Sequence, residues 1–556
     1  MKPFDPNGTF VPTVPTGGNE LRQLAVQGAG VTIFSGGVGL AIQVVATIVL
    51  ARLLTPNDFG VVTMVTTFSL LLVNFGLNGM TEAVIQRAEI THDLISTLFW
   101  INLAAGALLT VGFAACGSLM ARFYHDPRVR PVAAGISLMI VVTSLSVLHL
   151  ALLKRAMRFS DVSLNDIRAR FVSVLVSIGL GFAGWGYWAL VVGAVSLPVA
   201  TTIGAWSMCR WIPGRPRRVA GTESMVRFAL HSYGSFSVNY FSRNADNLLV
   251  GWRFDAQALG YYKKAYDLFA LSAGQLVSSI TVVVVSALSK VRHDEEQYRR
   301  YLFGAMTVMA FLGMGLSAAL TMVGTDIIRL LLGPKWAPSA HIFTYFAPGV
   351  GLMILYYTHS WIHLSIGRAD RWFRWELIEL SVTCLLFVLA LRWGPVGIAI
   401  AWTVSFGILT VPALWYAGRP IGLGVKPVLS IVWRYCVASL AAGLIVAFIL
   451  RQIPWLTEMR GKTGSLVRIS SISFMVAIFY VGGIVLLHGG WKPLWQMAGL
   501  MRELLPAKKL ARFFGPRSQT PAPDVLADLA PGLATTALES QAGFDPDACL
   551  QSREVD

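Results

Sequence analysis

The sequence predicts an all-α protein that crosses a membrane many times, and three observations support this fold class. Of the 556 residues, 55% are hydrophobic and only 13% are charged, about half the charged fraction of a soluble domain. The mean hydropathy is +0.62. The apolar residues gather in runs of about 20, the length that a helix needs to cross a bilayer core. These features exclude ordinary soluble, collagen-like and disordered proteins.

We predict about 14 membrane-spanning helices, each an apolar run bounded by polar segments. The predicted spans are 29–53, 60–80, 95–117, 131–153, 167–184, 187–209, 227–251, 262–288, 301–323, 341–366, 373–392, 395–417, 432–452 and 466–488. The segment 1–25 lacks the apolar core of a cleavable signal peptide. From about residue 506 the chain is rich in Pro, Ala, Asp, Ser and Thr, which predicts a disordered tail.

The distribution of positive charge predicts the orientation of the chain. With the N-terminus in the cytoplasm, about 30 of the 45 lysines and arginines fall in cytoplasmic segments and about 14 outside. An even number of spans then places both termini in the cytoplasm. In a membrane protein this bias accounts for the net charge of +16, so nucleic acid is not an expected partner.

The sequence contains no pattern typical of a metal, nucleotide or redox cofactor, and we expect no cofactor. The five cysteines are scattered singly, which argues against disulfide, zinc and iron–sulfur sites. His359 and His363 have the i, i+4 spacing of metal ligands, but no third ligand accompanies them, so packing histidines are the favoured interpretation. The chain also lacks the GxxxxGK[ST] loop that holds nucleotide phosphates.

Four sequence landmarks recur in the same order about 200–213 residues later, which is evidence for an internal duplication. LARLLTPNDFG is echoed by VGWRFDAQALG, ARFYHDPRV by IRLLLGPKWAP, LLKRAMRF by SIGRADRW, and WGYWALVV by WGPVGIAI. Because each unit has six helices, both enter the membrane from the same side and form parallel repeats. Chance recurrence of short loop motifs is the alternative.

The repeat and the spans together predict two pseudo-symmetric six-helix lobes around a central cavity, followed by two further helices. The predicted divisions are a cytoplasmic segment 1–25, an N-lobe 26–212, a linker 213–226, a C-lobe 227–420, a helix pair 421–490 and a cytoplasmic tail 491–556.

The predicted span 227–251 carries a polar stripe that lipid would not tolerate. Asn239, Arg243, Asp246 and Asn247 recur at spacings of three and four, and so share one helix face. An ionisable side chain in hydrocarbon costs at least about 2.5–3.5 kcal/mol, so this face is expected to line a cavity. The alternative is an ion pair between Arg243 and Asp246 that only fixes helix packing.

Further polar residues lie on predicted helices of both halves and extend the candidate substrate site. They are Gln43 in the first helix, Asn74, Asn78 and Glu82 in or beside the second, and Asp267 in the eighth. The first and seventh helices are equivalent under the repeat, as are the second and eighth. Polar faces on matching helices are the arrangement that a central hydrophilic cavity requires.

The landmarks, together with GMTEAVIQR, STLFWINL, SRNADNLLVG and LGYYKKAYDL, resemble the polysaccharide-transport (Wzx-like) branch of the multidrug/oligosaccharidyl-lipid/polysaccharide exporter superfamily. The resemblance covers about residues 25–425. It implies two six-helix lobes with a V-shaped cavity and a sugar-repeat unit on undecaprenyl pyrophosphate as substrate. Lipid II flippases of another branch use basic residues in their first helix, whereas this chain has no charge between Arg22 and Arg52. Arg243, Arg52 and Arg87 are therefore the candidate phosphate contacts.

The leading hypothesis is a flippase that moves lipid-linked oligosaccharides across the inner membrane by alternating access, and not an enzyme. Its expected partners are the bilayer, the polysaccharide polymerase and the chain-length machinery. The second hypothesis is a cation-coupled drug exporter, for which Asp246, Asp267 and Glu82 are the candidate carboxylates. The third is a membrane glycosyltransferase, polymerase or ligase, which usually needs a large outer loop; the predicted outer loops here are short.

Overall fold

The structure is a computed structural model, and the part of the chain that it describes is almost entirely helical. It describes residues 3–11, 18–87, 89–459, 461–491, 494–495 and 499. These residues form 18 α-helices and three short 3₁₀ helices. Within them no strand is present, only two isolated bridges near the N-terminus. The predicted all-α fold class is confirmed.

Residues 18–209 form seven α-helices. They are α1 (Gly18–Leu53), α2 (Pro56–Gln86), α3 (His92–Tyr124), α4 (Val129–Ser144), α5 (Val147–Arg155), α6 (Phe159–Phe182) and α7 (Tyr187–Cys209). The predicted span 131–153 is two helices, because the chain turns at residues 145–146 between α4 and α5.

The remainder of the described chain contains α8 to α18. They are α8 (Thr222–Arg253), α9 (Ala256–Lys290), α10 (Glu295–Leu332), α11 (Ala337–Phe346), α12 (Gly349–Tyr356), α13 (Thr358–Ser365), α14 (Ala369–Ala390), α15 (Gly394–Gly418), α16 (Val425–Gln452), α17 (Pro454–Glu458) and α18 (Gly461–His488). The predicted span 341–366 is broken into α11, α12 and α13.

Nine helical runs in the described residues are long and apolar enough to cross a membrane, and a tenth is the pair 334–346 and 349–365, bent by 55°. One run, Ala369–Ile421, contains two predicted spans. The predicted spans that are missing from this set coincide with α6, α8 and α9. The chain is thus a multi-pass membrane protein, and the count of 14 spans stays a prediction.

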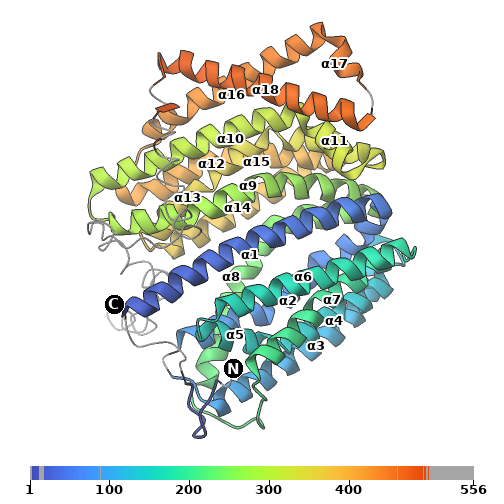
Figure 1. Ribbon diagram of the computed structural model, residues 1–556, viewed down its shortest axis with the longest axis vertical. Coiled ribbons are helices and arrows are strands. Elements are labelled where there is room, and N and C mark those ends of the chain that lie inside the picture. Colours follow the sequence, from blue (N-terminus) through green and yellow to red (C-terminus); the bar gives the residue numbers. More distant parts are fainter. Residues whose placement is uncertain are drawn as a thin grey trace, which may run out of the picture. The chain divides into compact units, whose positions relative to one another are not determined.

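The chain divides into two compact units, the first up to Lys263 and the second from Lys264 onward. In the first unit α3, α4, α6 and α7 lie side by side and α1 packs on α6 (Figure 1). In the second unit α10 packs against α12 and also against α16 and α18. The division falls inside α9, because α8 packs along α2 of the first unit. The lobe boundaries drawn from the repeat stay a prediction.

Helix boundaries repeat along the chain as the sequence landmarks do. α1 ends at Leu53, and its equivalent α8 ends at Arg253. α6 begins at Phe159, and its equivalent α14 begins at Ala369. These offsets agree with the spacing of the landmarks. Each landmark therefore marks a connection between helices, and the matching breaks support two pseudo-symmetric sets of six spans.

Two equivalent glycines place the first turns of α2 and α9 in direct main-chain contact within the first unit. A Cβ atom on Gly60 would lie 1.6 Å from the carbonyl oxygen of Ala256, and one on Gly260 would lie 1.8 Å from that of Pro56. The two contacts are reciprocal, so they lie about a local two-fold axis. Only glycine allows the two backbones to approach this closely.

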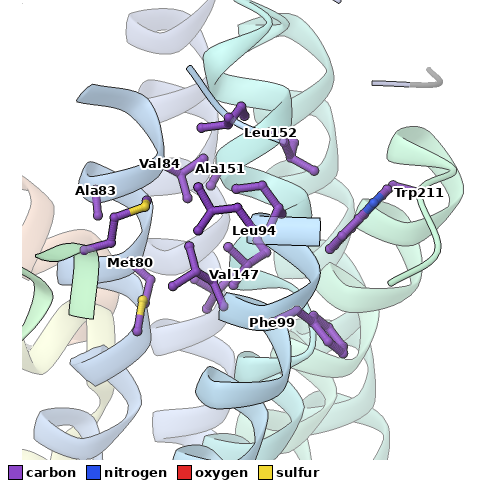
Figure 2. Close-up of a cluster of buried hydrophobic side chains, with 14 of the residues drawn as sticks. Met80, Ala83, Val84, Leu94, Phe99, Val147, Ala151, Leu152 and Trp211 are labelled. Carbon is purple, nitrogen blue, oxygen red and sulfur yellow. The ribbon is translucent and has the colours of Figure 1, made fainter. Parts of the chain in front are cut away.

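The core of the first unit lies where α2, α3 and α5 meet. Figure 2 shows Leu94 of α3 among Val84 of α2 and Val147 and Ala151 of α5; all four are at most 3% exposed. Burial of such side chains contributes about 1.5–3 kcal/mol each in water, and in the bilayer the benefit is close packing. This core fixes the position of α2, and α8 packs along α2.

The connections α1–α2, α3–α4 and α6–α7 meet at one end of the first unit, here called the α1–α2 end. Thr55 caps α2 in a reciprocal capping box with Asp58. Arg128 donates from Nη2 to Asn57 Oδ1 (3.1 Å) and to Asp126 Oδ2 (2.7 Å). The landmarks LARLLTPNDFG and ARFYHDPRV are therefore parts of one polar network.

The opposite end of the first unit, the α2–α3 end, is tied by the segment between α7 and α8. Trp100 donates to the carbonyl of Gly214 (2.8 Å), and Thr97 donates to the carbonyl of Arg217 (2.8 Å). His149 of α5 contacts the carbonyl of Trp211 through Nε2 (3.1 Å). Residues 211–217 of this segment therefore cross α3 and α5 and hydrogen-bond to both helices.

Candidate functional site

The predicted polar stripe lies on α8, a continuous helix of 32 residues. Asn239 and Arg243 are partly buried, and Asn247 is 1% exposed. Asn247 also bonds Asn244 through their side-chain amides (3.4 Å). The structure therefore brings the central predicted residues onto one helix face, with Arg243 one turn from each asparagine.

Two tyrosines on the same side of α8 attach this helix to α2. Tyr233 donates to the carbonyl of Leu71 (3.1 Å), and Tyr240 donates to the carbonyl of Thr67 (2.8 Å). The tyrosines are seven residues apart, or two helical turns. Part of the stripe's face is thus used for packing. The cavity-lining interpretation missed this role, although the spacing of the tyrosines is visible in the sequence.

Asp246 is fully buried and turns toward the start of α9. Its Oδ2 accepts a hydrogen bond from Tyr262 (2.7 Å), and its Oδ1 accepts one from the backbone N–H of Asn247 (2.8 Å). Tyr262 lies on another helix, so spacing in the sequence could not reveal this pair. Charged hydrogen bonds of this kind contribute about 1.5–3 kcal/mol, and Asp246 thereby couples α8 to α9.

Two predicted residues lie at the α2–α3 end of the first unit. Arg87 follows the last residue of α2 and donates to the carbonyl of Gly221 (3.1 Å), just before α8. Glu82, partly buried, acts electrostatically on Lys154 of α5. Arg155 donates to the carbonyls of Val84 and Arg87 (2.7 and 2.5 Å). The Arg155 bonds supply donors to carbonyl groups at the C-terminal end of α2, which have no partner within the helix.

The remaining predicted residues are distributed along α1, α2 and α9. Gln43 and Arg52 are exposed on α1, and Asn74 donates to the carbonyl of Leu70 in its own helix (2.7 Å). Asp267 lies 3.8 Å from Lys264. The side chain of Asn78 lies outside the described residues.

The two helix-flanking arginines proposed as phosphate contacts lie at opposite ends of α2. Arg52 lies in the last turn of α1, four residues before α2 begins at Pro56, and Arg87 immediately follows α2. A helix of 31 residues is about 46 Å long at 1.5 Å per residue. One pyrophosphate cannot reach both side chains, so Arg243 is the predicted basic residue that combines a mid-helix position with amide neighbours.

The electrostatics of the α1–α2 end are set by the Asp126–Arg128 pair in the connection between α3 and α4. Burial alone would raise the pKa of the Asp126 carboxyl, but hydrogen bonds and charge from Arg128 outweigh it and lower that pKa. The same contacts raise the pKa of Arg128. This end therefore holds a fixed ion pair at neutral pH.

The chemistry available on α8 is recognition by hydrogen bonding and charge. A guanidinium can bind a phosphate group through two parallel hydrogen bonds, and side-chain amides can donate to and accept from sugar hydroxyls. In the described residues no group of three or more His, Cys, Asp or Glu side chains is placed to hold a metal ion.

Comparison with proteins of known sequence identifies relatives from polysaccharide biosynthesis. The chain is 24% identical over 373 residues to the teichuronic acid biosynthesis protein TuaB of Bacillus subtilis, covering 66% of this chain and 77% of TuaB. It is 24% identical over 322 residues to the lipopolysaccharide biosynthesis protein WzxC of Escherichia coli, covering 57% and 65%. It is 20% identical over 405 residues to the succinoglycan biosynthesis transport protein ExoT of Rhizobium meliloti, covering 73% and 82%.

Two solved structures share the fold. The lipid II flippase MurJ in an inward closed conformation matches with a TM-score of 0.65 at 16% identity, over 82% of this chain and 98% of MurJ. An inward-facing multidrug transporter of the MATE family matches with a TM-score of 0.57 at 11% identity, over 70% and 96%. The model of the polysaccharide biosynthesis protein family matches residues 49–341. Because this match spans more than half of the sequence, the chain belongs to the polysaccharide biosynthesis protein family.

Proposed function

We propose that this protein is a flippase for oligosaccharide repeat units linked to undecaprenyl pyrophosphate. It moves precursors of lipopolysaccharide, exopolysaccharide or capsule across the bacterial inner membrane by alternating access. The observation that carries the proposal is the polar face of α8, with Arg243 between Asn239 and Asn247, in a multi-pass member of this family. The names of WzxC and ExoT support the same substrate class.

The physical problem of this reaction is the headgroup, because the isoprenoid tail can stay in lipid. Each buried polar group without a hydrogen bond costs about 1–3 kcal/mol in proteins, so an oligosaccharide needs a hydrated, polar path. A pyrophosphate also needs a cationic partner. We assign Arg243 to the pyrophosphate and Asn239 and Asn247 to the first sugars.

The orientation follows from the distribution of positive charge. We place both termini in the cytoplasm, so that the α1–α2 end of the first unit is periplasmic and the α2–α3 end is cytoplasmic. We also propose that the protein transfers no group and acts only in transport, beside the polymerase and chain-length machinery that use its product.

The test is translocation of lipid-linked oligosaccharides by purified protein in vesicles, with an added glycosidase reporting on molecules that reach the outer leaflet. Arg243→Ala should reduce the rate at least about tenfold, the factor that 1.4 kcal/mol represents. Arg243→Lys should be intermediate, because an ammonium keeps the charge but cannot form two parallel bonds.

The matched control is Arg227→Ala on the same helix, since Arg227 is exposed and forms an i, i+4 ion pair with the exposed Glu223 (2.7 Å). This variant should translocate at the wild-type rate. Wild-type translocation by Arg243→Ala would contradict the assignment of Arg243. Absence of translocation by the wild-type protein would contradict the flippase function itself.

A further inference from the structure

The first unit contains an arginine at membrane depth that is not among the predicted site residues. Arg170 is the twelfth of the 24 residues of α6, so about 16–18 Å of helix lies on either side of it. The hydrocarbon core of a bilayer is about 30 Å thick, and the middle of a helix of about 36 Å lies inside it. Arg170 therefore needs polar surroundings, because an arginine is costly in hydrocarbon.

The neighbouring helix α1 supports this depth. α1 packs along α6 (Figure 1). A Cβ atom on Gly39 would lie 3.4 Å from Arg170 Nε, and one on Gly181 would lie 3.7 Å from the side chain of Leu50. These contacts are eleven residues apart on both helices, so the two helices run in parallel. Gly39 belongs to Gly30–Leu53, the run of α1 that is long and apolar enough to cross a membrane, and Arg170 lies beside this run.

The apolar exposed residues of α6 lie on a different face from Arg170. Phe171 and Leu175 are 54% and 53% exposed, as expected of residues that face lipid. They lie about 100° and 140° from Arg170 around the helix axis. Ser173, close to Arg170 on the same face, donates to the carbonyl of Gly193 on α7 (2.7 Å). The face that carries Arg170 is therefore turned toward α1 and α7.

The guanidinium of Arg170 is held along one edge. Its Nε donates to Asp166 Oδ2, one turn earlier on α6 (2.8 Å). Within the described residues Nη1 and Nη2 make no hydrogen bond, so four of the five N–H donors remain for a ligand. The side chains of Arg170 and Asp166 are 38% and 45% exposed. An ion pair that is partly exposed inside the membrane must contact water or a polar ligand.

The glycine at position 39 leaves room for this side chain beside α1. Gly39 is buried, and both Cδ and Nε of Arg170 would lie 3.4 Å from a Cβ at this position. Gln43 lies one turn further along α1 and is exposed, so it shares the face of Gly39. Its amide can donate a hydrogen bond to a phosphate oxygen. The predicted substrate residue Gln43 thus lies one turn along the surface that Arg170 contacts.

Arg170 and Arg243 lie at matching depths in the first unit. α6 ends at Phe182 and α8 ends at Arg253, and both ends belong to the α1–α2 end of the unit, since α9 begins there against α2. Arg170 is twelve residues and Arg243 ten residues before these ends. At 1.5 Å per residue the two arginines are about 18 and 15 Å from the α1–α2 end. They therefore lie at nearly one level.

The headgroup of the proposed substrate carries two negative charges. A pyrophosphate that is esterified at both ends, by the isoprenoid and by the sugar, keeps one acidic group on each phosphorus, and both are ionised at neutral pH. An unbalanced charge is costly away from bulk water. One guanidinium balances one of the two charges, so Arg243 leaves a charge for a second cation.

We propose that Arg170 is a second phosphate-binding residue of the translocation path. Nη1 and Nη2 bind one phosphate of the pyrophosphate, Gln43 donates to the same headgroup, and Asp166 fixes the guanidinium through Nε. The proposal rests on the proposed function and deepens it, because two arginines at one level select a pyrophosphate over a monophosphate.

The experiment measures binding of three lipids to the full-length protein in detergent: undecaprenyl pyrophosphate, undecaprenyl monophosphate and phosphatidylglycerol. The wild type should bind the pyrophosphate at least about tenfold more tightly than either other lipid. Arg170→Gln keeps a polar side chain but loses the charge. It should bind the pyrophosphate within about twofold of the monophosphate, and its rate of oligosaccharide translocation should fall as well.

The matched control is Arg168→Gln on the same helix. Arg168 is exposed and lies about 160° from Arg170 around the helix axis, so this variant should keep the wild-type preference for the pyrophosphate. Gln43→Ala changes an exposed position and tests the site even if Arg170→Gln fails to fold. It should weaken binding of the pyrophosphate about threefold, since one hydrogen bond is lost.

Asp166→Asn separates phosphate binding from a role in packing alone. It removes the carboxylate that competes with phosphate for the guanidinium, so binding of the pyrophosphate should stay at the wild-type level or become tighter. If the ion pair only fixes α6, Arg170→Gln and Asp166→Asn should weaken binding equally and lower the midpoint of thermal unfolding equally. That result would overturn the assignment of Arg170.

The remaining outcomes separate this site from the flippase function. Equal affinity of the wild type for undecaprenyl pyrophosphate and phosphatidylglycerol would show a site for any lipid phosphate and overturn the selection of a pyrophosphate. A folded Arg170→Gln that keeps the preference would overturn the assignment. These measurements use no sugar. A wild type that binds the pyrophosphate with the expected preference but translocates no oligosaccharide would contradict the flippase function and leave the phosphate site standing.

Discussion

The two halves of the chain share the positions of their helix breaks but differ in what they bury beside them. In the first half His149 packs between Trp206 and the carbonyl of Trp211. At the equivalent place in the second half, the His359 ring packs against Tyr356, whose hydroxyl donates to the buried carboxylate of Glu379. A duplicated backbone therefore preserves where helices end, while the side chains near those ends are free to acquire separate tasks.

The two halves also differ in the side chains that hold the connections between their helices. The connection between α3 and α4 is held by the ion pair of Asp126 and Arg128. Its counterpart between α10 and α11 is held by Trp336, which is fully buried. Between α14 and α15, Arg392 lies over the ring of Trp393 at 4.0 Å. Charge stabilises the first half here, and aromatic packing stabilises the second.

The largest expected effect concerns the contact between the equivalent first turns of α2 and α9. Gly60→Ala and Gly260→Ala each place a Cβ within 1.6 and 1.8 Å, respectively, of a backbone carbonyl oxygen, so a helix must move. Overpacking of this severity should cost at least about 2–3 kcal/mol, measured as a lower midpoint of thermal unfolding in detergent. The near two-fold arrangement predicts similar losses for both variants.

The control for this pair is Gly274→Ala on α9, where a Cβ meets nothing within 4 Å. Its midpoint should stay unchanged or rise, since alanine favours a helix over glycine by about 1 kcal/mol. A loss confined to Gly60→Ala or to Gly260→Ala would show that the contact is not symmetric.

The next prediction concerns the free energy that the ion pair of Asp126 and Arg128 contributes to the connection between α3 and α4. Arg128→Ala removes the side-chain bonds to Asn57 and Asp126 and should cost about 1–2 kcal/mol, reduced from a buried value because Arg128 is partly exposed. The exposed Arg130 in the first turn of α4 provides the control, and Arg130→Ala should leave the unfolding midpoint unchanged. Equal losses for the two variants would refute the network.

The Asp126 carboxyl should also make the first half sensitive to acid. Its pKa is lowered in the folded protein, so its contribution to stability is complete above its ordinary pKa of about 3.9 and is lost as the pH falls through the lowered value. Between pH 6 and pH 3 the unfolding midpoint of the wild type should fall more steeply than that of Asp126→Asn. Parallel profiles would contradict this role.

The smallest effect is expected in the second half. Arg392→Ala removes an exposed cation–π contact with Trp393 and should cost about 0.5–1 kcal/mol. Arg392→Lys should recover part of the loss in the same unfolding measurement. A loss larger than that of Arg128→Ala would reverse the contrast between a charged and an aromatic connection.

The sequence predicts those features that depend on neighbouring residues. The break between α1 and α2 follows from Thr55, Pro56 and Asp58, which are typical of a helix start, and the stripe around Arg243 follows from helical spacing. The contact of Asp246 with Tyr262 and the approach of Gly60 to Ala256 depend on how separate helices pack. No local pattern encodes them.

The surroundings of the histidines on α13 also depend on how separate helices pack. The absence of a third ligand beside His359 and His363 favours packing, and the sequence could not show that Tyr356 contacts both the His359 ring and the carboxylate of Glu379. The breaks within 131–153 and 341–366 are also invisible in the sequence, since apolar composition alone does not distinguish a straight helix from a bent one.

The paired glycines restrict which substitutions this chain can tolerate. Other positions of α2 and α9 can change one side chain at a time, since a neighbouring side chain can adjust. At Gly60 and Gly260 the neighbour is main chain, which cannot shrink to compensate. A substitution at either glycine therefore requires the partner helix to shift, so each position limits the other although they lie far apart along the chain.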